Sequence, residues 1–224
     1  MVRKIVKSEE EVKDDQGIYY TTPKKSLVTF TSGCSLLDCA LGGGWPIGRV
    51  SNIVGDKSTG KTLLAIEACA NFARRFPDGL IRYGEAEAAF DKSYAESVGF
   101  PVDRVEFVGE ADGESELVTI EDLFEDLTAT IDRMREQNIY PGLYVVDSLD
   151  ALSDRDEQVR DMDKGSYGAE KAKKLSQLFR RLIRPMEEVG LTLMVISQVR
   201  DAIGVTFGKK YRRSGGRALD FYAS

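Results

Sequence analysis

Short apolar runs alternate with amphipathic segments along most of the chain. Five runs rich in β-branched or aromatic residues predict strands at 49–55, 79–85, 103–109, 142–149 and 191–197. Four segments with apolar positions near a 3.6-residue period predict helices at 61–76, 91–99, 119–137 and 168–190. Parallel strands need crossover connections, so this alternation predicts an α/β fold: a mostly parallel sheet with helices on both faces.

Size and composition fit one globular domain. The chain has 224 residues, of which 42% are hydrophobic and 30% are charged, enough to bury one sizeable core. The N-terminal residues are polar and without periodicity, so we assign 1–30 to a partly mobile leader and 31–224 to the core. No signal peptide or apolar run of membrane-spanning length is present, which favours a soluble cytoplasmic protein with no membrane partner.

The cysteines do not indicate a disulfide framework or a zinc site. Cys34, Cys39 and Cys69 are odd in number, lack CxxC spacing and have no histidine to join them. We expect them to be small apolar side chains in a reducing compartment.

One motif predicts a nucleotide site. The sequence GDKSTGKT fits G-x-x-x-x-G-K-[ST], follows a predicted strand and opens a predicted helix. Its glycines allow backbone N–H groups to turn toward a phosphate, Lys61 can reach the terminal phosphates of ATP, and the Thr62 hydroxyl can bind Mg²⁺. The expected nucleotide-binding residues are therefore Gly55, Asp56, Lys57, Ser58, Thr59, Gly60, Lys61 and Thr62.

A carboxylate completes the expected Mg²⁺ site. Residues 143–146 are continuously apolar, as in a strand buried on both faces, and Asp147 follows directly at the carboxyl end where α/β folds bind ligands. Hydrolysis also needs a base to activate water. Glu85 and Glu87 both follow another predicted strand, and the pattern alone leaves the choice between them open.

Charge is unevenly distributed along the chain. The formal net charge is -6, yet the segment 171–217 contains twelve Lys or Arg and three acids, a local balance of +9. Such asymmetry favours a surface for a polyanion on one side of the molecule.

Several longer segments resemble the bacterial and phage RecA-type recombinases. They are SGCSLLDCALGGGWPIGRVSNIVGDKSTGKTLLA, EAEAAFDKSYAESVG, VVDSLDAL and SQVRDAIGVTFGKKYRRSGGRALDFYAS, which occur in that family's order and nearly with its spacing. The resemblance covers about residues 30 to 224 and implies a P-loop, RecA-like ATPase core. It implies a DNA-dependent ATPase that self-associates into a filament or ring on single-stranded DNA and pairs it with homologous duplex DNA.

The resemblance also assigns roles within the site. It makes Glu87, rather than Glu85, the catalytic glutamate that activates water. With Lys61 of the P-loop and Gln198, this gives three expected catalytic residues. Asp91 and Tyr94 match the pair that contacts adenine. Gln198 matches the glutamine that senses the γ-phosphate, as an amide can by hydrogen bonding to a phosphate oxygen.

In such a chain, 153–167 and 199–217 would be mobile loops that bind DNA. Binding without sequence preference needs cations for phosphates, apolar side chains that enter between bases, and glycines that allow close approach. The basic segment offers all three, and the helix before it extends the cationic track. The expected DNA-binding residues are Lys173, Arg180, Ile203, Gly204, Phe207, Lys209, Lys210, Arg212, Arg213, Gly215, Gly216 and Arg217.

The chain departs from the family pattern in three places. Ala88 stands where the family often has a histidine, and the family's long N-terminal helix is replaced by a segment of weak pattern. The family sequence continues past ALDFYAS into strands whose lysines reach the ATP of the adjacent subunit. We therefore expect a truncated or split form, unless a residue among Lys209, Lys210, Arg212 and Arg213 takes over that role.

Three functions compete at this point. The first is an ATP-dependent DNA recombinase, and the second is a DNA-binding accessory paralogue that uses ATP as a structural switch with little turnover. The third, a P-loop enzyme acting on a small molecule, is disfavoured because no part of the sequence resembles a second substrate pocket.

Overall fold

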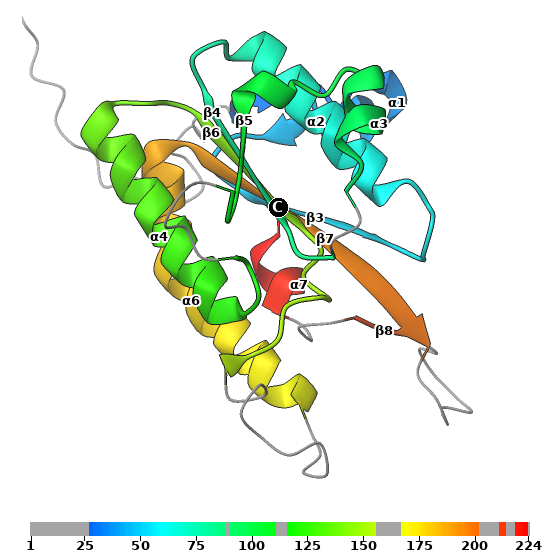
Figure 1. Cartoon of the computed structure of the whole chain (residues 1–224), viewed down its shortest axis with the longest axis vertical. Coiled ribbons are helices and arrows are strands. Elements are labelled where there is room, and N and C mark those ends of the chain that lie inside the picture. Colours follow the sequence, from blue (N-terminus) through cyan, green and yellow to red (C-terminus); the bar gives the residue numbers. More distant parts are fainter. Residues whose placement is uncertain are drawn as a thin grey trace, which may run out of the picture.

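The computed structural model describes residues 27–87, 90–110, 116–155, 167–201, 211–213 and 218–223. Its centre is a sheet in the order β3-β7-β6-β4-β5, in which every pair of neighbours is parallel (Figure 1). The strands are β3 (Val50–Gly55), β4 (Leu80–Glu85), β5 (Val105–Phe107), β6 (Gly142–Asp147) and β7 (Leu191–Asp201). The predicted α/β fold with a mostly parallel sheet is confirmed.

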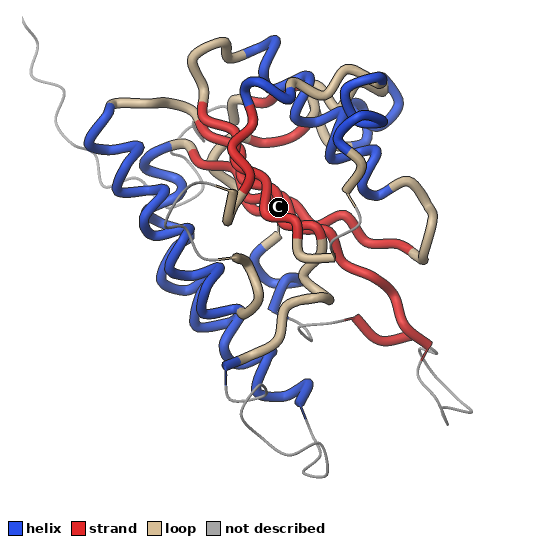
Figure 2. The backbone as a smooth tube through the Cα atoms, viewed as in Figure 1, coloured by secondary structure: helices blue, strands red, loops and turns tan. Residues whose placement is uncertain are grey.

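Helices cover both faces of the sheet, as Figure 2 shows. One face packs against α2 (Lys61–Arg75) and α3 (Lys92–Ser97), the other against α4 (Ile120–Gln137), α6 (Tyr167–Val189) and α7 (Ala218–Tyr222). Each of the four helices expected from periodicity is present, with both ends within a residue or two of those predicted.

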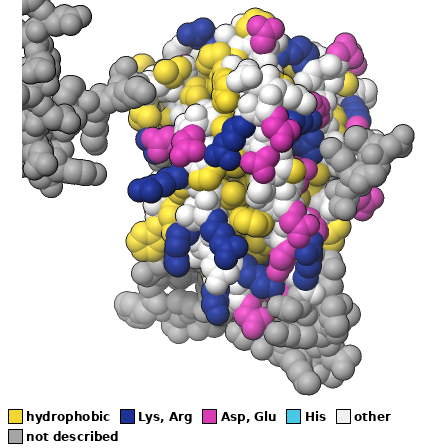
Figure 3. Space-filling view, turned by 90° about the vertical axis from the view of Figure 1, so that its left-hand side faces the viewer, with side chains coloured by type: hydrophobic (Ala, Val, Ile, Leu, Met, Phe, Trp, Pro, Cys, Tyr) yellow, Lys and Arg dark blue, Asp and Glu magenta, His cyan; other side chains and the backbone are white. Residues whose placement is uncertain are grey.

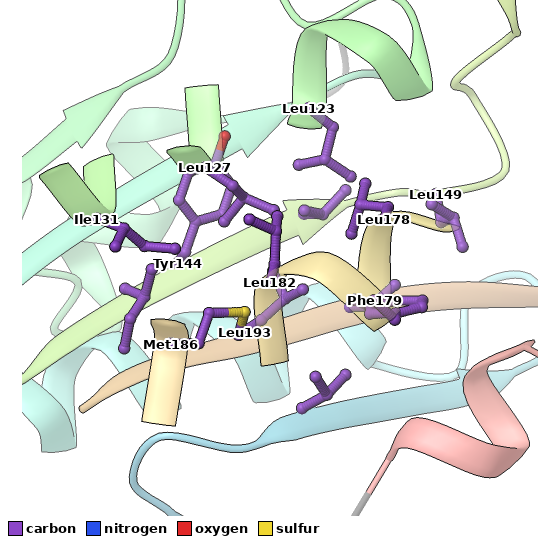
Figure 4. Packing of buried hydrophobic residues seen from close by; sticks show 14 of the residues in the cluster. Leu123, Leu127, Ile131, Tyr144, Leu149, Leu178, Phe179, Leu182, Met186 and Leu193 are labelled. Carbon is purple, nitrogen blue, oxygen red and sulfur yellow. The ribbon is translucent and has the colours of Figure 1, made fainter. Parts of the chain in front are cut away.

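Two apolar clusters separate these layers. Side chains of α4 and α6, among them Leu127 and Phe179, meet Tyr144 and Leu193 of the sheet (Figure 4). On the other face Ile66 and Phe72 of α2 pack on the opposite side chains of the same strands. Strand β6 is fully buried, as its continuous apolar run predicts.

The polar ends of the elements have local explanations. Helix α4 begins at a capping box, in which the Thr119 hydroxyl accepts from Asp122 N and the Asp122 carboxylate accepts from Thr119 N. It ends at Asn138, whose φ of 53° is a left-handed conformation that Asn tolerates. These caps fix where α4 starts and stops against the sheet.

The structure adds elements that the pattern did not predict. Two short strands and a short helix precede β3: β1 (Thr29–Phe30), α1 (Ser35–Ala40) and β2 (Trp45–Pro46). A 3-10 helix, η1 (Val102–Arg104), lies before β5. Strand β7 also continues beyond the predicted Ser197 to Asp201 and pairs antiparallel with β8 (Tyr211–Arg213). The expectation of a loop throughout 199–217 is therefore wrong for 199–201 and 211–213, which satisfy each other's backbone groups in a hairpin.

A nucleotide site at the carboxyl ends of the strands

The P-loop connects the end of β3 to the start of α2. Gly60 has a φ of 84°, a conformation that glycine adopts at little cost, and a Cβ on Gly55 would lie 2.7 Å from Thr59 Oγ1. A cavity of about 230 Å³ is lined by Ser58, Thr59, Gly60, Lys61 and Thr62. Lys61 Nζ donates to Asp56 O at 2.6 Å, so the amino group lies over the loop. This cradle fits a phosphate group at a helix N-terminus.

Thr62 and Asp147 come together although 85 residues separate them. Thr62 Oγ1 donates to Asp147 Oδ2 at 2.8 Å, and Tyr83 OH donates to the same oxygen at 2.9 Å. Burial raises the pKa of the Asp147 carboxyl above its ordinary value; the nearby charges of Glu87 and Glu85 act in the same direction, and the two hydrogen bonds oppose the shift. A hydroxyl and a carboxylate at this spacing fit a Mg²⁺ site that combines few protein oxygens with substrate phosphates.

Within the described ranges, no cluster of three or more His, Cys, Asp or Glu side chains could hold a metal ion. The role of Thr62 and Asp147 as Mg²⁺ ligands stays a prediction.

The structure separates the two candidate glutamates. Glu87 Oε1 accepts from Gln198 Nε2 at 2.7 Å and from Ser148 Oγ, which brings together side chains that follow β4 and β6 with one from within β7. Glu85 Oε1 instead accepts from the main-chain N of Glu87 at 3.1 Å. Sequence reasoning missed Ser148, although its place directly after Asp147 at the end of a buried strand was a usable signal.

Gln198 lies beside the first residue of the P-loop. In the parallel ladder of β3 and β7, its register partner is Gly55. Ser197 Oγ donates to Asn52 Oδ1 at 2.8 Å, a second link between the same strands. The two predicted sites, P-loop and Gln198, are therefore adjacent in the sheet.

Asp91 and Tyr94 lie at the start of α3. Asp91 caps the helix by accepting from Tyr94 N at 3.0 Å, and this hydrogen bond, with a second from Ser93 Oγ, lowers the pKa of the Asp91 carboxyl. The Tyr94 side chain is 52% exposed. The structure thus explains Asp91 as a cap, and its expected contact with adenine stays a prediction.

A larger cavity of about 370 Å³ lies at the carboxyl ends of β4 and β5. Phe90, Phe107 and Leu117 line it together with Glu85, Lys92 and Glu110. The sequence offered no sign of this second cavity.

The expected DNA-binding residues divide into two groups. Lys173 and Arg180 are exposed on α6, and the backbones of Arg212 and Arg213 lie in β8. The others lie outside the described residues: Ile203, Gly204, Phe207, Lys209, Lys210, Gly215, Gly216 and Arg217. Among the helices of the described ranges, none is both long and apolar enough to span a bilayer.

Comparisons with known proteins agree with this geometry. The model of the RecA N-terminal domain matches residues 18–224. A protein named RecA from Nostoc punctiforme is 37% identical over 196 residues, covering 88% of this chain and 50% of that protein. Another named RecA, from Synechococcus sp. (strain CC9605), is 38% identical over 197 residues, covering 88% of this chain and 48% of its own length. This chain spans about half the length of these curated relatives. Since the family model covers most of the sequence, the chain belongs to the RecA family.

Proposed function

We propose that this protein is the ATPase core of a DNA recombinase. The observation that carries the proposal is the meeting of Glu87, Ser148 and Gln198 next to the Thr62–Asp147 pair, at the carboxyl end of the sheet. We assign this core to residues 31–224 and an N-terminal leader to 1–30. The relatives carry the name RecA, which supports the assignment at the level of the family.

ATP would be held by the P-loop and by residues at the carboxyl ends of the strands. The N–H groups at the start of α2 would bind phosphate oxygens, and Lys61 would move from Asp56 O to the terminal phosphates. Thr62 and Asp147 would hold Mg²⁺, which when bound offsets the charge of the phosphate oxygens. Asp91 and Tyr94 would contact the adenine.

Glu87 would orient the attacking water and take its proton. Both donors that the structure gives its carboxylate, Ser148 Oγ and Gln198 Nε2, bind Oε1. Oε2, the other oxygen of the group, would accept the proton of water. Gln198 would exchange this bond for one to the γ-phosphate when ATP binds. Because β7 runs on into the hairpin with β8, that exchange would reach the DNA-binding segment.

Single-stranded DNA would lie along the hairpin and the start of α6. Lys173 and Arg180 are exposed on one face of this helix, about 10 Å apart along its axis at 1.5 Å per residue. Figure 3 shows this side of the molecule, where several Lys and Arg side chains gather around the lower half. The residues of 203–217 named above would add phosphate and base contacts, and self-association into a filament or ring would align many copies for pairing with homologous duplex DNA.

ATP hydrolysis measured with and without single-stranded DNA tests the proposal. We expect DNA to stimulate turnover, Glu87→Gln to bind ATP without hydrolysing it, and Lys61→Ala to lose ATP binding because the cation that offsets phosphate charge is gone. Glu85→Gln is the matched comparison, since that carboxylate faces the Glu87 main chain instead. DNA binding that depends on ATP without turnover would favour the accessory paralogue. Hydrolysis indifferent to DNA, or unaffected by Glu87→Gln, would contradict the proposal.

A further inference from the structure

Strand β6 ends before its neighbour β7 does, and a turn takes its place. The ladder between them ends at the pair Val146 and Val195. Beyond it, Leu149 N donates to Ile196 O at 3.0 Å, and Gln198 N donates to the Asp150 carboxylate oxygen Oδ2 at 2.6 Å. A carbonyl and the N–H two residues later lie on the same side of a strand. The turn therefore supplies both partners that a longer β6 would have given to β7.

The turn that carries Asp150 is itself held firmly. The Lys171 amino group, on α6, donates to Leu149 O at 2.9 Å and also to Leu152 O. Lys171 is only 8% exposed, and the side chains of Leu149 and Leu152 are buried. The Asp150 carboxylate is thus presented to β7 by a turn fixed to both the helix and the core.

Hydrogen bonds from this one turn reach both Glu87 and Gln198. Ser148 Oγ donates to Glu87 Oε1, Asp150 accepts from the main chain of Gln198, and the Gln198 amide donates back to Glu87 at 2.7 Å. The main chain of Gln198 is therefore held by Asp150, and its side chain by Glu87, through separate hydrogen bonds. One residue further on, Val199 begins the hairpin with β8.

We propose that Asp150 is a positioning residue that couples the nucleotide site to the DNA-binding hairpin. Its carboxylate holds Gln198 N in place, so that a change of partner by the Gln198 amide displaces the hairpin instead of being absorbed by a shift of the strand. The inference rests on the function proposed above, because it assigns Asp150 a part in the response of that site to nucleotide. It is independent of which group acts as the base.

The test compares Asp150→Ala with Asp150→Asn in the 224-residue chain. Asn keeps an oxygen that can accept from Gln198 N, whereas Ala removes it. Asp103→Asn, at an exposed acid of η1, is the control for charge. The affinity for a fluorescent single-stranded oligonucleotide is measured with and without Mg²⁺ and a non-hydrolysable ATP analogue. Amide hydrogen exchange is followed in the peptide that contains 196–201.

We expect Asp150→Ala to reduce the analogue's effect on DNA affinity by about 10-fold, a typical size for a coupling between two sites. Affinity for the analogue alone should stay within about twofold, because Asp150 has no part in the P-loop. Exchange at 196–201 should become faster, and Asp150→Asn should recover most of both effects.

Unchanged exchange and unchanged coupling in Asp150→Ala would overturn the inference, as would an Asp150→Asn variant no better than Ala. A parent chain whose DNA affinity ignores the analogue would contradict the proposed function instead. In that case exchange alone decides the positioning role: faster exchange in Ala that Asn restores supports it, and unchanged exchange overturns it.

Discussion

Asp147 is a proposed Mg²⁺ ligand whose burial disfavours the charged form of its carboxyl group. Its carboxylate is 7% exposed, and burial raises its pKa. A carboxyl whose pKa is higher in the folded than in the unfolded chain binds more protons when folded, between the two values. The stability that it contributes is therefore full below the unfolded pKa and is lost as the pH rises through the folded one.

Asp147→Asn should therefore stabilise the nucleotide-free protein at neutral pH by about 1–2 kcal/mol, the usual range for a buried polar group that is incompletely compensated. Asn still offers an oxygen to Thr62 and Tyr83. Urea unfolding between pH 4 and 7 checks this, and the variant should show a smaller fall in stability with rising pH than the parent. In the same variant, Mg²⁺-dependent ATP binding should weaken. An Asn variant less stable than the parent at neutral pH would show that the carboxylate charge is well compensated.

Arg82 is a second buried charge, and its role is structural. It lies in the middle of β4 at 3% exposure, donates to Asp126 of α4 from both Nη2 and Nε, at 2.6 and 3.3 Å, and donates to Glu106 of β5 at 3.0 Å. Tyr144 OH donates to the same Asp126 at 2.7 Å. This network ties helix α4 to the sheet.

Arg82→Met should destabilise the fold by about 1–3 kcal/mol, since it removes the guanidinium fork from the partly buried Asp126 carboxylate. The double variant Arg82→Met with Asp126→Leu should recover much of that loss. Chemical unfolding of both single variants and the double variant gives the coupling. Losses that simply add would mean that the two side chains do not act as a pair.

At the scale of elements, the sequence predicted the main strands and helices but not which partners their polar side chains contact. Continuous apolar runs located the five core strands, and 3.6-residue periods located the four helices, because burial on two faces or on one leaves those patterns. Arg82 breaks its run without breaking the strand, since its partners come from 24 and 44 residues away. The choice of Glu87 over Glu85 and the part played by Ser148 likewise depend on contacts between strand ends that only the tertiary fold creates.

Helix α6 carries the prediction for DNA binding. If Lys173 and Arg180 bind phosphates, neutralising both to Gln should reduce the slope of log affinity against log salt by about 1.4, or about 0.7 for each phosphate of a single strand that is no longer neutralised. Arg75→Gln removes an exposed cation from α2, on the opposite face of the sheet, and should leave the slope unchanged. The measurement is a salt titration of oligonucleotide binding. An equal effect of all three neutralisations would indicate a diffuse charge effect.

At the scale of the whole molecule, the proposed function requires many copies to act together. We expect single-stranded DNA with ATP and Mg²⁺ to convert the protein into long assemblies in sedimentation experiments, and Lys61→Ala to prevent this because assembly would follow nucleotide binding. Arg75→Gln should assemble as the parent does. If the protein binds DNA only as separate copies, the proposed filament or ring is wrong. The proposed ATPase activity would still be decided by the hydrolysis measurement.

The pairing of strand β7 determines how the sheet would respond to a pulling force on the hairpin. The strand pairs with β3 over 193–198 and with β6 over 191–195, and its far end forms the hairpin with β8. Ladder bonds run across the strand direction. A pull on the hairpin along β7 would therefore load all of these bonds in shear at once, instead of opening them one after another. Tension applied to the hairpin by a stretched polymer would be carried into the sheet before β7 could slip.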